Sequence, residues 1–228
     1  MQYRTELKFI CDPCKLMLIE DKIRAICMPD SHAGPDGLYL IRSLYFDSPD
    51  NMFYAQTRNG LDHRYKYRIR IYDKSDSRIT LERKESLHGK KHKDISVIPG
   101  DLLEAVLEGR DYGSEDDLVS RFFLDRKLFL LEPRVIIEYS RAPYVYSIGN
   151  VRITFDKSIF ASDSFDLFKN DLTGIDVLPG GHGILEVKYD DVLPGAIKKM
   201  FNSYDLQAVS FSKYVRAVDA MNGIVGEC

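Results

Sequence analysis

The sequence lacks the long apolar segments of membrane and secreted proteins. No apolar run reaches about 18 residues, and no hydrophobic segment begins the chain, so we expect neither a membrane span nor a signal peptide. A cytoplasmic location fits both absences. Internal repeats, linkers and low-complexity tracts are also missing. The 228 residues therefore suit a single domain over residues 1–228.

Positive charge is not in excess over the whole chain. The 32 Lys and Arg residues face 35 Asp and Glu residues, which gives a formal net charge of −3. A general nucleic-acid-binding protein carries a basic excess. We therefore expect no nucleic-acid partner.

Cysteine is scarce and forms no disulfide framework. Cys11 and Cys14 make one Cys-x-x-Cys pair, but the sequence has no second such pair and no histidine nearby. A zinc or redox site is an alternative on this spacing alone. Asp12 and Pro13 instead have the residue types of a helix N-cap and first helical position, and we favour that interpretation.

Charged and apolar residues alternate in several segments. In residues 63–72, Lys66, Arg68 and Arg70 alternate with tyrosines and isoleucines, and this period of two predicts a strand with one cationic and one apolar face. In residues 79–84, Glu82 and Lys84 share one side of a second strand. Because a solvated sheet face gives the same alternation, the interpretation depends on its repetition along the chain.

These patterns predict an antiparallel α+β fold of about eight strands with peripheral helices. Strands are expected at 3–10, 38–47, 63–72, 79–84, about 93–98, 134–144, 151–156 and 183–189. Helices are expected at 13–25, from 48 toward 60, and at 101–108, 115–130, 194–201 and 212–221. Ile26 and Leu128 complete apolar stripes on the first and fourth helices. The segment 158–181 has no regular pattern.

The charged positions of the expected strands share one face. Eight bases and five acids give this face a formal charge of +3, whereas the rest of the chain carries −6. The bases are Lys8, Lys66, Arg68, Arg70, Lys84, Arg134, Arg152 and Lys188, and the acids are Glu6, Glu82, Glu138, Asp156 and Glu186. A dry core cannot hold these ions, because desolvating each costs several kcal/mol and a whole domain is stable by about 5–15 kcal/mol. The face therefore lies either in open solvent or around the wet lumen of a closed sheet with helices outside, and the pattern alone leaves both open.

Seven short motifs occur in order along the chain. They are Glu6-Leu-Lys8, Ser-Leu-Tyr45-Phe-Asp47, Arg68-Ile-Arg70, Leu-Glu82-Arg-Lys84, Val-Arg152-Ile-Thr-Phe-Asp156, Leu-Glu186-Val-Lys188 and Ser210-Phe-Ser212-Lys213-Tyr214. The ordered set resembles the VTC (vacuolar transporter chaperone) domain of polyphosphate polymerases, within the triphosphate tunnel metalloenzyme superfamily. The resemblance covers residues 3–220.

The resemblance implies an eight-stranded antiparallel β-barrel tunnel with a charged lumen, which binds triphosphate groups and Mn²⁺ or Mg²⁺. It implies phosphate-holding, catalytic roles for Lys8, Arg68, Arg70, Lys84, Arg152 and Lys188, and phosphate contacts for Arg58, Lys93, Arg141 and Lys213. The strand pattern adds Lys66 and Arg134 to the phosphate-binding set. Glu186 matches the metal-holding glutamate of the family, and Glu6 and Glu82 are the other acidic candidates for the metal. Tyr45 and Tyr214 are interpreted as packing residues.

The implied reaction moves the γ-phosphate of a nucleoside triphosphate onto a polyphosphate chain. Arg4 stands where the hydrolytic branch of the superfamily has the first glutamate of its E-x-E-x-K signature, and this departure favours polymerase chemistry. The alternatives are a metal-dependent triphosphatase or tripolyphosphatase, and a silent module that only binds polyphosphate or nucleotide. Polymerases of the family that export their product are attached to membrane helices, so any such coupling here would need a separate membrane-protein partner.

Overall fold

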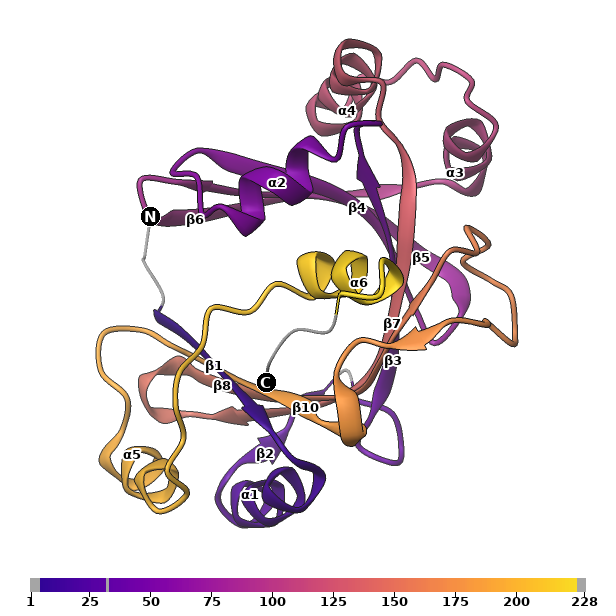
Figure 1. Ribbon diagram of the computed structural model, residues 1–228. Helices are drawn as coiled ribbons and strands as arrows, with labels where there is room; N and C mark the ends of the chain where they lie inside the picture. Colours follow the sequence, from indigo (N-terminus) through magenta and orange to yellow (C-terminus); the bar gives the residue numbers. More distant parts are fainter. Residues whose placement is uncertain (1–4, 32, 225–228) are drawn as a thin grey trace.

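One antiparallel sheet organises the computed structural model, which describes residues 5–31 and 33–224. Tyr3 and Arg4 of the expected first strand lie outside this part. The main path of the sheet runs in the order β1-β10-β8-β7-β3-β4-β5-β6 (Figure 1). Its strands are β1 (Thr5–Cys11), β3 (Tyr39–Asp47), β4 (Arg64–Tyr72), β5 (Ser75–Leu87), β6 (Lys90–Ile98), β7 (Glu132–Tyr146), β8 (Val151–Ser162) and β10 (Gly183–Tyr189). Short β2 (Met28–Pro29) pairs with β7, and β9 (Ile175–Asp176) pairs with β8.

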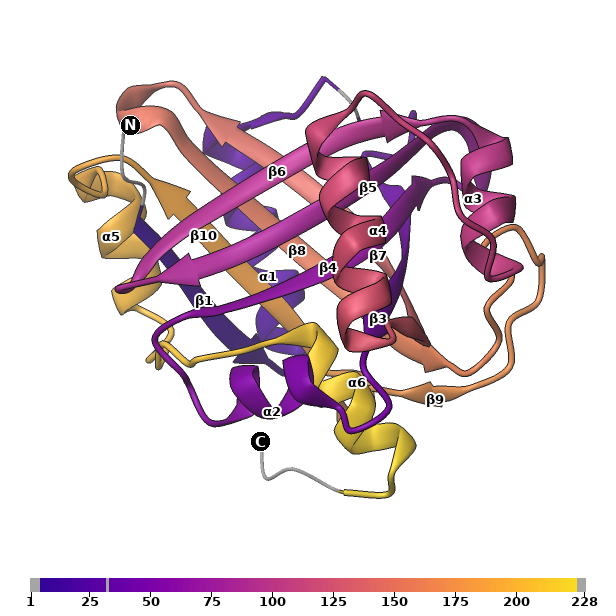
Figure 2. The same cartoon turned by 90° about the horizontal axis from the view of Figure 1, so that it is seen from above.

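The sheet is strongly curled, so that the strands at the two ends of its path face each other (Figure 1, Figure 2). In a flat sheet with strands about 4.8 Å apart, β1 and β6 would be separated by about 34 Å. Instead, Lys91 Nζ of β6 lies 2.8 Å from Glu6 Oε2 of β1. The predicted eight-stranded antiparallel α+β tunnel fold is confirmed. The sheet forms a half-barrel and not a closed barrel, since no backbone pairing joins the described residues of β1 and β6.

The C-terminal part of the chain runs beside β1 and then enters the curve of the sheet. The Val209 amide donates a hydrogen bond of 2.8 Å to the Lys8 carbonyl. Figure 1 shows α6 (Lys213–Met221) inside the curve. We call this concave side of the sheet the inner face. The outer side is covered by α1 (Pro13–Ile26), α3 (Gly100–Leu107), α4 (Asp117–Phe129) and α5 (Gly195–Asn202), and α2 (Met52–Arg58) lies beside α6.

Aromatic and aliphatic residues of the outer side pack beneath these helices. The ring of Phe122 on α4 lies 5.1 Å from that of Phe46 on β3 and 5.2 Å from that of Tyr67 on β4, centroid to centroid. Two predicted stripe residues are instead exposed: Ile26 ends α1 and is 44% exposed, and Leu128 is 64% exposed on the solvent side of α4. No helix within the described residues has both the length and the apolarity needed to cross a membrane.

The carboxylate of Asp47, the last residue of β3, joins β3, α2 and α6. Its oxygens accept hydrogen bonds from the amides of Ser48 (2.8 Å), Phe53 (2.8 Å) and Tyr54 (2.9 Å), and from the hydroxyl of Tyr214 on α6. The amide of Phe53 and that of Tyr54 belong to the first turn of α2, where donors have no partner within the helix. Asp47 therefore satisfies that turn and fixes the position of α6 at the same time.

Strand β7 presents to the inner face the side chains that the sequence pattern assigned to the outer one. In the register with β3, Val135 lies opposite Tyr45, and Glu138 lies opposite Arg42. Tyr45 points to the inner face, and side chains alternate between the two faces along each strand. Arg42 and Glu138, which are three residues from Tyr45 and Val135, therefore lie on the outer side, where they form an ion pair. Arg134 is exposed, at a β-bulge beside Tyr45. The prediction that Glu138 shares the face of the other strand charges is therefore wrong, and the bulge takes Arg134 out of the alternation.

Candidate functional site

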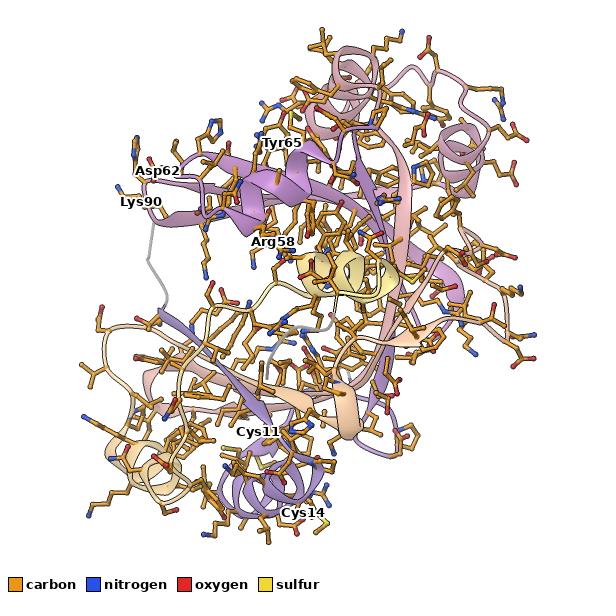
Figure 3. All side chains as sticks on the ribbon, viewed as in Figure 1. Cys11, Cys14, Arg58, Asp62, Tyr65 and Lys90 are labelled. Atoms are coloured by element: carbon orange, nitrogen blue, oxygen red, sulfur yellow. The ribbon has the colours of Figure 1, made fainter. Side chains whose placement is uncertain are left out.

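Cations outnumber carboxylates on the inner face of the sheet. The first wall, made of β1, β10, β8, β7 and α6, carries Lys8, Arg141, Arg152, Lys188, Lys213, Glu6, Asp156 and Glu186. The second wall, made of β4, β5 and β6, carries Lys66, Arg68, Arg70, Lys84, Lys93 and Glu82. Figure 3 shows side chains from both walls pointing toward the space around α6. The basic excess of the inner face therefore lies between the two walls.

Asp156 is the centre of the first wall. Its fully buried carboxylate accepts hydrogen bonds from Arg141 Nε (2.6 Å) and Nη2 (2.8 Å) and from Lys213 Nζ (2.5 Å). Burial opposes ionisation of this carboxyl, but Arg141 and Lys213 outweigh burial and lower its pKa. Because an ionised Asp156 orients both cations, it acts as a positioning residue for two predicted phosphate ligands.

Glu82 has the corresponding place on the second wall. Its Oε2 accepts a hydrogen bond of 2.8 Å from Arg68 Nε, and its Oε1 lies 3.8 Å from Arg70 Nη1 and 3.9 Å from Lys93 Nζ. Burial opposes its ionisation, yet Arg68, Arg70 and Lys93 lower its pKa to about 2. One carboxylate thus holds three cations, which leaves most of their charge unbalanced.

Hydroxyl groups complete the support of the two arginines. Tyr45 accepts a hydrogen bond of 2.8 Å from Arg68, while Ser43 and Tyr139 accept bonds of 3.0 Å and 3.3 Å from Arg70. Sequence reasoning gave Tyr45 only a packing role and left the other two unassigned. The spacing in the sequence could have placed Ser43 beside Tyr45 in the site, because residues two apart on a strand share one face, here the inner side of β3.

Three lysines stand side by side across the second wall. Lys84 of β5 lies opposite Lys66 of β4 and Lys93 of β6, and like charges directly opposite each other destabilise a sheet. Burial, reinforced by Lys8, lowers the pKa of Lys84 to about 7. Burial also holds the pKa of Lys66 well below its ordinary value, with Lys84 and Lys8 acting in the same direction, and it lowers the pKa of Lys93. A multivalent anion between the walls would relieve this repulsion and favour the charged form of each lysine.

Two of the three predicted metal carboxylates lie together on the first wall. Lys8 Nζ lies 3.2 Å from Glu6 Oε1 and 4.0 Å from Glu186 Oε2. Burial opposes ionisation of both glutamates, but the surrounding cations lower the pKa of Glu6 to about 2 and hold that of Glu186 well below its ordinary value. Glu6 Oε1 is buried, and among the described residues it has the ion pair with Lys8 but no hydrogen bond.

This pair of glutamates fits a divalent cation. Mg²⁺ is usually held by one or two protein carboxylates and completes its shell with water and substrate phosphate oxygens. Glu6 Oε1, which makes no hydrogen bond although Lys8 lies 3.2 Å away, would offer such a set together with the ionised Glu186. Glu82 lies on the second wall and is held by arginines, so the structure separates it from the pair. In the part of the chain that the structure describes, His, Cys, Asp and Glu side chains form no group of three that could hold a metal.

Two predicted phosphate ligands lie at the margin of the cluster or outside it. Arg152 is on the inner face opposite Lys188, but its half-exposed guanidinium lies 3.1 Å from Asp30. Arg58 forms an ion pair with Asp219 of α6 and donates to Tyr54 within α2. Figure 3 shows Arg58 beside α6. The structure therefore gives Arg58 a part in joining α2 to α6 and does not bring it into either wall.

A curled antiparallel sheet with a basic inner face places the protein among those with the triphosphate tunnel fold. The family model described as the VTC domain matches residues 3–222, and the chain belongs to this family. The resemblance noted from the ordered motifs is thereby confirmed. Comparison with curated proteins finds no match.

Two solved structures are similar to the chain over most of its length. A candidate adenylate cyclase from Bacillus halodurans superposes with a TM-score of 0.58 at 14% identity, over 92% of this chain and 94% of that chain. A protein from Pyrococcus horikoshii OT3 gives a TM-score of 0.49 at 15% identity, over 95% of this chain and 98% of that chain. The first of these similarities supports the shared fold across nearly the whole length of both chains.

Proposed function

We propose that the protein transfers the γ-phosphate of a nucleoside triphosphate to phosphate or to a growing polyphosphate chain. The observation that carries the proposal is the unbalanced cationic charge of the two walls, with three lysines whose pKa values are lowered by burial and by neighbouring cations. A chain of linked phosphates has the shape and the charge density to lie between two such walls. Membership of the VTC domain family supports the same conclusion.

The walls supply what this chemistry needs. Phosphoryl transfer requires positioning and neutralisation of the transferring group more than covalent assistance. Arg68 and Arg141 are held by carboxylates with the guanidinium plane fixed, and a fixed guanidinium suits two-point contact with phosphate oxygens. Lys8 and Lys188 act as point charges near the glutamate pair.

Mn²⁺ or Mg²⁺ would be held by Glu6 and Glu186. When bound, the ion would neutralise phosphate oxygens and orient the triphosphate. The protein groups contribute the rest: Asp156 keeps Arg141 and Lys213 in place, and Glu82 keeps Arg68 in place. Both carboxylates stay ionised because the cations around them lower their pKa values.

The test is incubation of the protein with ATP and Mn²⁺, followed by separation of the products on a gel. Long polyphosphate together with ADP is the expected result. ADP with only monomeric phosphate would show a hydrolase, and binding of ATP without ADP would show a silent binding module. Lys188→Met should lower polymer synthesis by about 10-fold or more, because it removes a charge-assisted contact. Lys199→Met, which makes the same change on the exposed side of α5, should leave synthesis unchanged.

A further inference from the structure

Ser212 places a hydroxyl group among the cations of the site. It is the N-cap of α6, and its Oγ accepts a hydrogen bond of 3.4 Å from the Val215 amide. Lys66 Nζ of β4 lies 3.0 Å from the same oxygen, although the two residues are 146 apart in the sequence. On one side of Ser212, the Phe211 carbonyl accepts a bond of 3.0 Å from Lys8, and on the other side Lys213 binds Asp156.

Helix capping alone does not explain the contact with Lys66. A cap needs only an oxygen that accepts from the first turn, and Ser212 meets that need through Val215. Lys66 is partly buried, with Lys84 opposite it and Lys8 nearby, and burial and these neighbours hold its pKa well below the ordinary value. A lowered pKa favours the neutral amine, and a neutral amine 3.0 Å from a hydroxyl oxygen can take the hydroxyl proton, as Ser–Lys pairs do in enzymes.

We propose that Ser212 is a phosphate acceptor, and that this protein phosphorylates it with the γ-phosphate of a nucleoside triphosphate. Ser212 Oγ forms a bond to the γ-phosphorus while the bond from that phosphorus to the β–γ bridging oxygen breaks. The hydroxyl proton moves to Lys66 Nζ, and the nucleoside diphosphate leaves with the bridging oxygen and its electron pair. The inference rests on the proposed function, because it uses the same nucleotide in the same site, and it identifies a first acceptor for the phosphate.

The surroundings of Ser212 would stabilise the product. A phosphoserine carries close to two negative charges at neutral pH and gains from cations and from a helix N-terminus. Lys66 would be protonated after the transfer and would pair with the new phosphate at the contact already present. Lys8 and Lys213 lie on either side through their contacts with Phe211 and Asp156.

The test uses the whole chain with γ-labelled ATP and Mn²⁺, an acid quench, and mapping of the labelled peptide. We expect up to one acid-stable phosphate per chain, on Ser212. Ser212→Asn should abolish the label while the fold is retained, because asparagine caps helices as well as serine does and has no hydroxyl. Ser212→Thr keeps both the cap and the hydroxyl and should restore labelling. Ser210→Ala removes an exposed hydroxyl two residues away and is the matched control.

Lys66→Met tests the proton transfer. A positioned general base contributes about 10²–10⁴-fold, so we expect labelling to slow by at least about 100-fold, while ATP affinity falls far less. Thermal unfolding of each variant shows whether the fold is kept.

The possible results separate the inference from the proposed function. Three results would each overturn the inference: polymer formation without label on Ser212, label on another residue, or an unchanged labelling rate in Lys66→Met. The first of these results would leave the proposed function intact. Label on Ser212 without polymer would support the inference and refute the polymerase.

Discussion

Lys84 gives the sharpest test of the electrostatics of the site. Its pKa is lowered to about 7 by burial and by nearby lysines, so about one-tenth of Lys84 is protonated at pH 8 when no anion is bound. A polyanion between the walls favours the charged form and returns the pKa toward its ordinary value. Binding at pH 8 should therefore take up about 0.9 proton at this residue, against about 0.1 at pH 6.

The sign of the pH dependence follows from this uptake. Above pH 7 the bound state holds more protons than the free state. The contribution of Lys84 to the affinity for the anion is therefore fully present below pH 7 and is lost as the pH rises. The contribution of Lys84 should approach a tenfold loss of affinity per pH unit between about pH 8 and pH 10. Titration calorimetry with tripolyphosphate, without metal and in buffers of different ionisation enthalpy, measures both the uptake and the affinity.

Comparison with Lys84→Met isolates the residue. The protons that tripolyphosphate itself gains or loses are present in both proteins and cancel to a first approximation in the difference. Removing Lys84 also raises the pKa of Lys66, which adds to the difference in the same direction. We expect wild type to exceed the variant by about 0.9 proton at pH 8, and Lys199→Met to behave as wild type. Equal proton uptake by wild type and Lys84→Met at pH 8 would refute the conclusion that the pKa of Lys84 is lowered in the free protein.

Three further substitutions test other parts of the structure. Arg70→Ala should weaken triphosphate binding by about 10-fold or more in calorimetry, with the fold retained because the change relieves repulsion between cations. Glu186→Gln should reduce the rate and the response to a Mn²⁺ titration more than it reduces nucleotide affinity. Asp47→Ala should lower the free energy of unfolding in urea by about 3 kcal/mol, because it leaves the first turn of α2 and a buried tyrosine hydroxyl without their acceptor.

Each of these results has a control. Arg134→Ala removes an exposed arginine from the same sheet and should leave binding unchanged; wild-type affinity in Arg70→Ala would instead place Arg70 outside the site. An unchanged Mn²⁺ titration in Glu186→Gln would remove that residue from the metal pair. Asp50→Ala changes an exposed carboxylate near Asp47 and should cost less than about 1 kcal/mol.

The alternation of charge was sufficient to predict most of the inner face. Lys66, Arg68 and Arg70 share one side of β4, and Glu82 and Lys84 share the same side of β5, because the period of a strand is fixed by backbone geometry. The N-cap role of Asp12 is confirmed, since its carboxylate accepts from the Lys15 amide. Local rules therefore hold wherever the backbone is regular.

The same reasoning failed for β7 because charge does not reveal which side of a strand is solvated. Glu138 pairs on the outer side with Arg42, whose guanidinium also donates to the carbonyls of Leu167 and Lys169. Those carbonyls belong to the segment that had no regular pattern, so the sequence offered no sign that it covers an ion pair. A β-bulge beside Arg134 adds to the irregularity.

Contacts between distant parts of the chain were also beyond prediction. The ordered motifs included both Lys66 and the segment with Ser212, but nothing in their spacing showed that an amine of β4 meets the cap of α6. Asp156 was recognised as a charge on the inner face, and its hold on Arg141 and Lys213 became visible only in the folded chain.

The bond from Lys8 to the Phe211 carbonyl joins residues 203 apart in the sequence, and this has a consequence for biosynthesis. A ribosome releases β1 early and α6 late, and contacts of such separation cannot form until both are available. A nascent chain stopped before residue 207 would have Asp156 without Lys213 and would lack the hydroxyl of Ser212. On the proposed function, such unfinished chains should consume no nucleotide until α6 has been released from the ribosome.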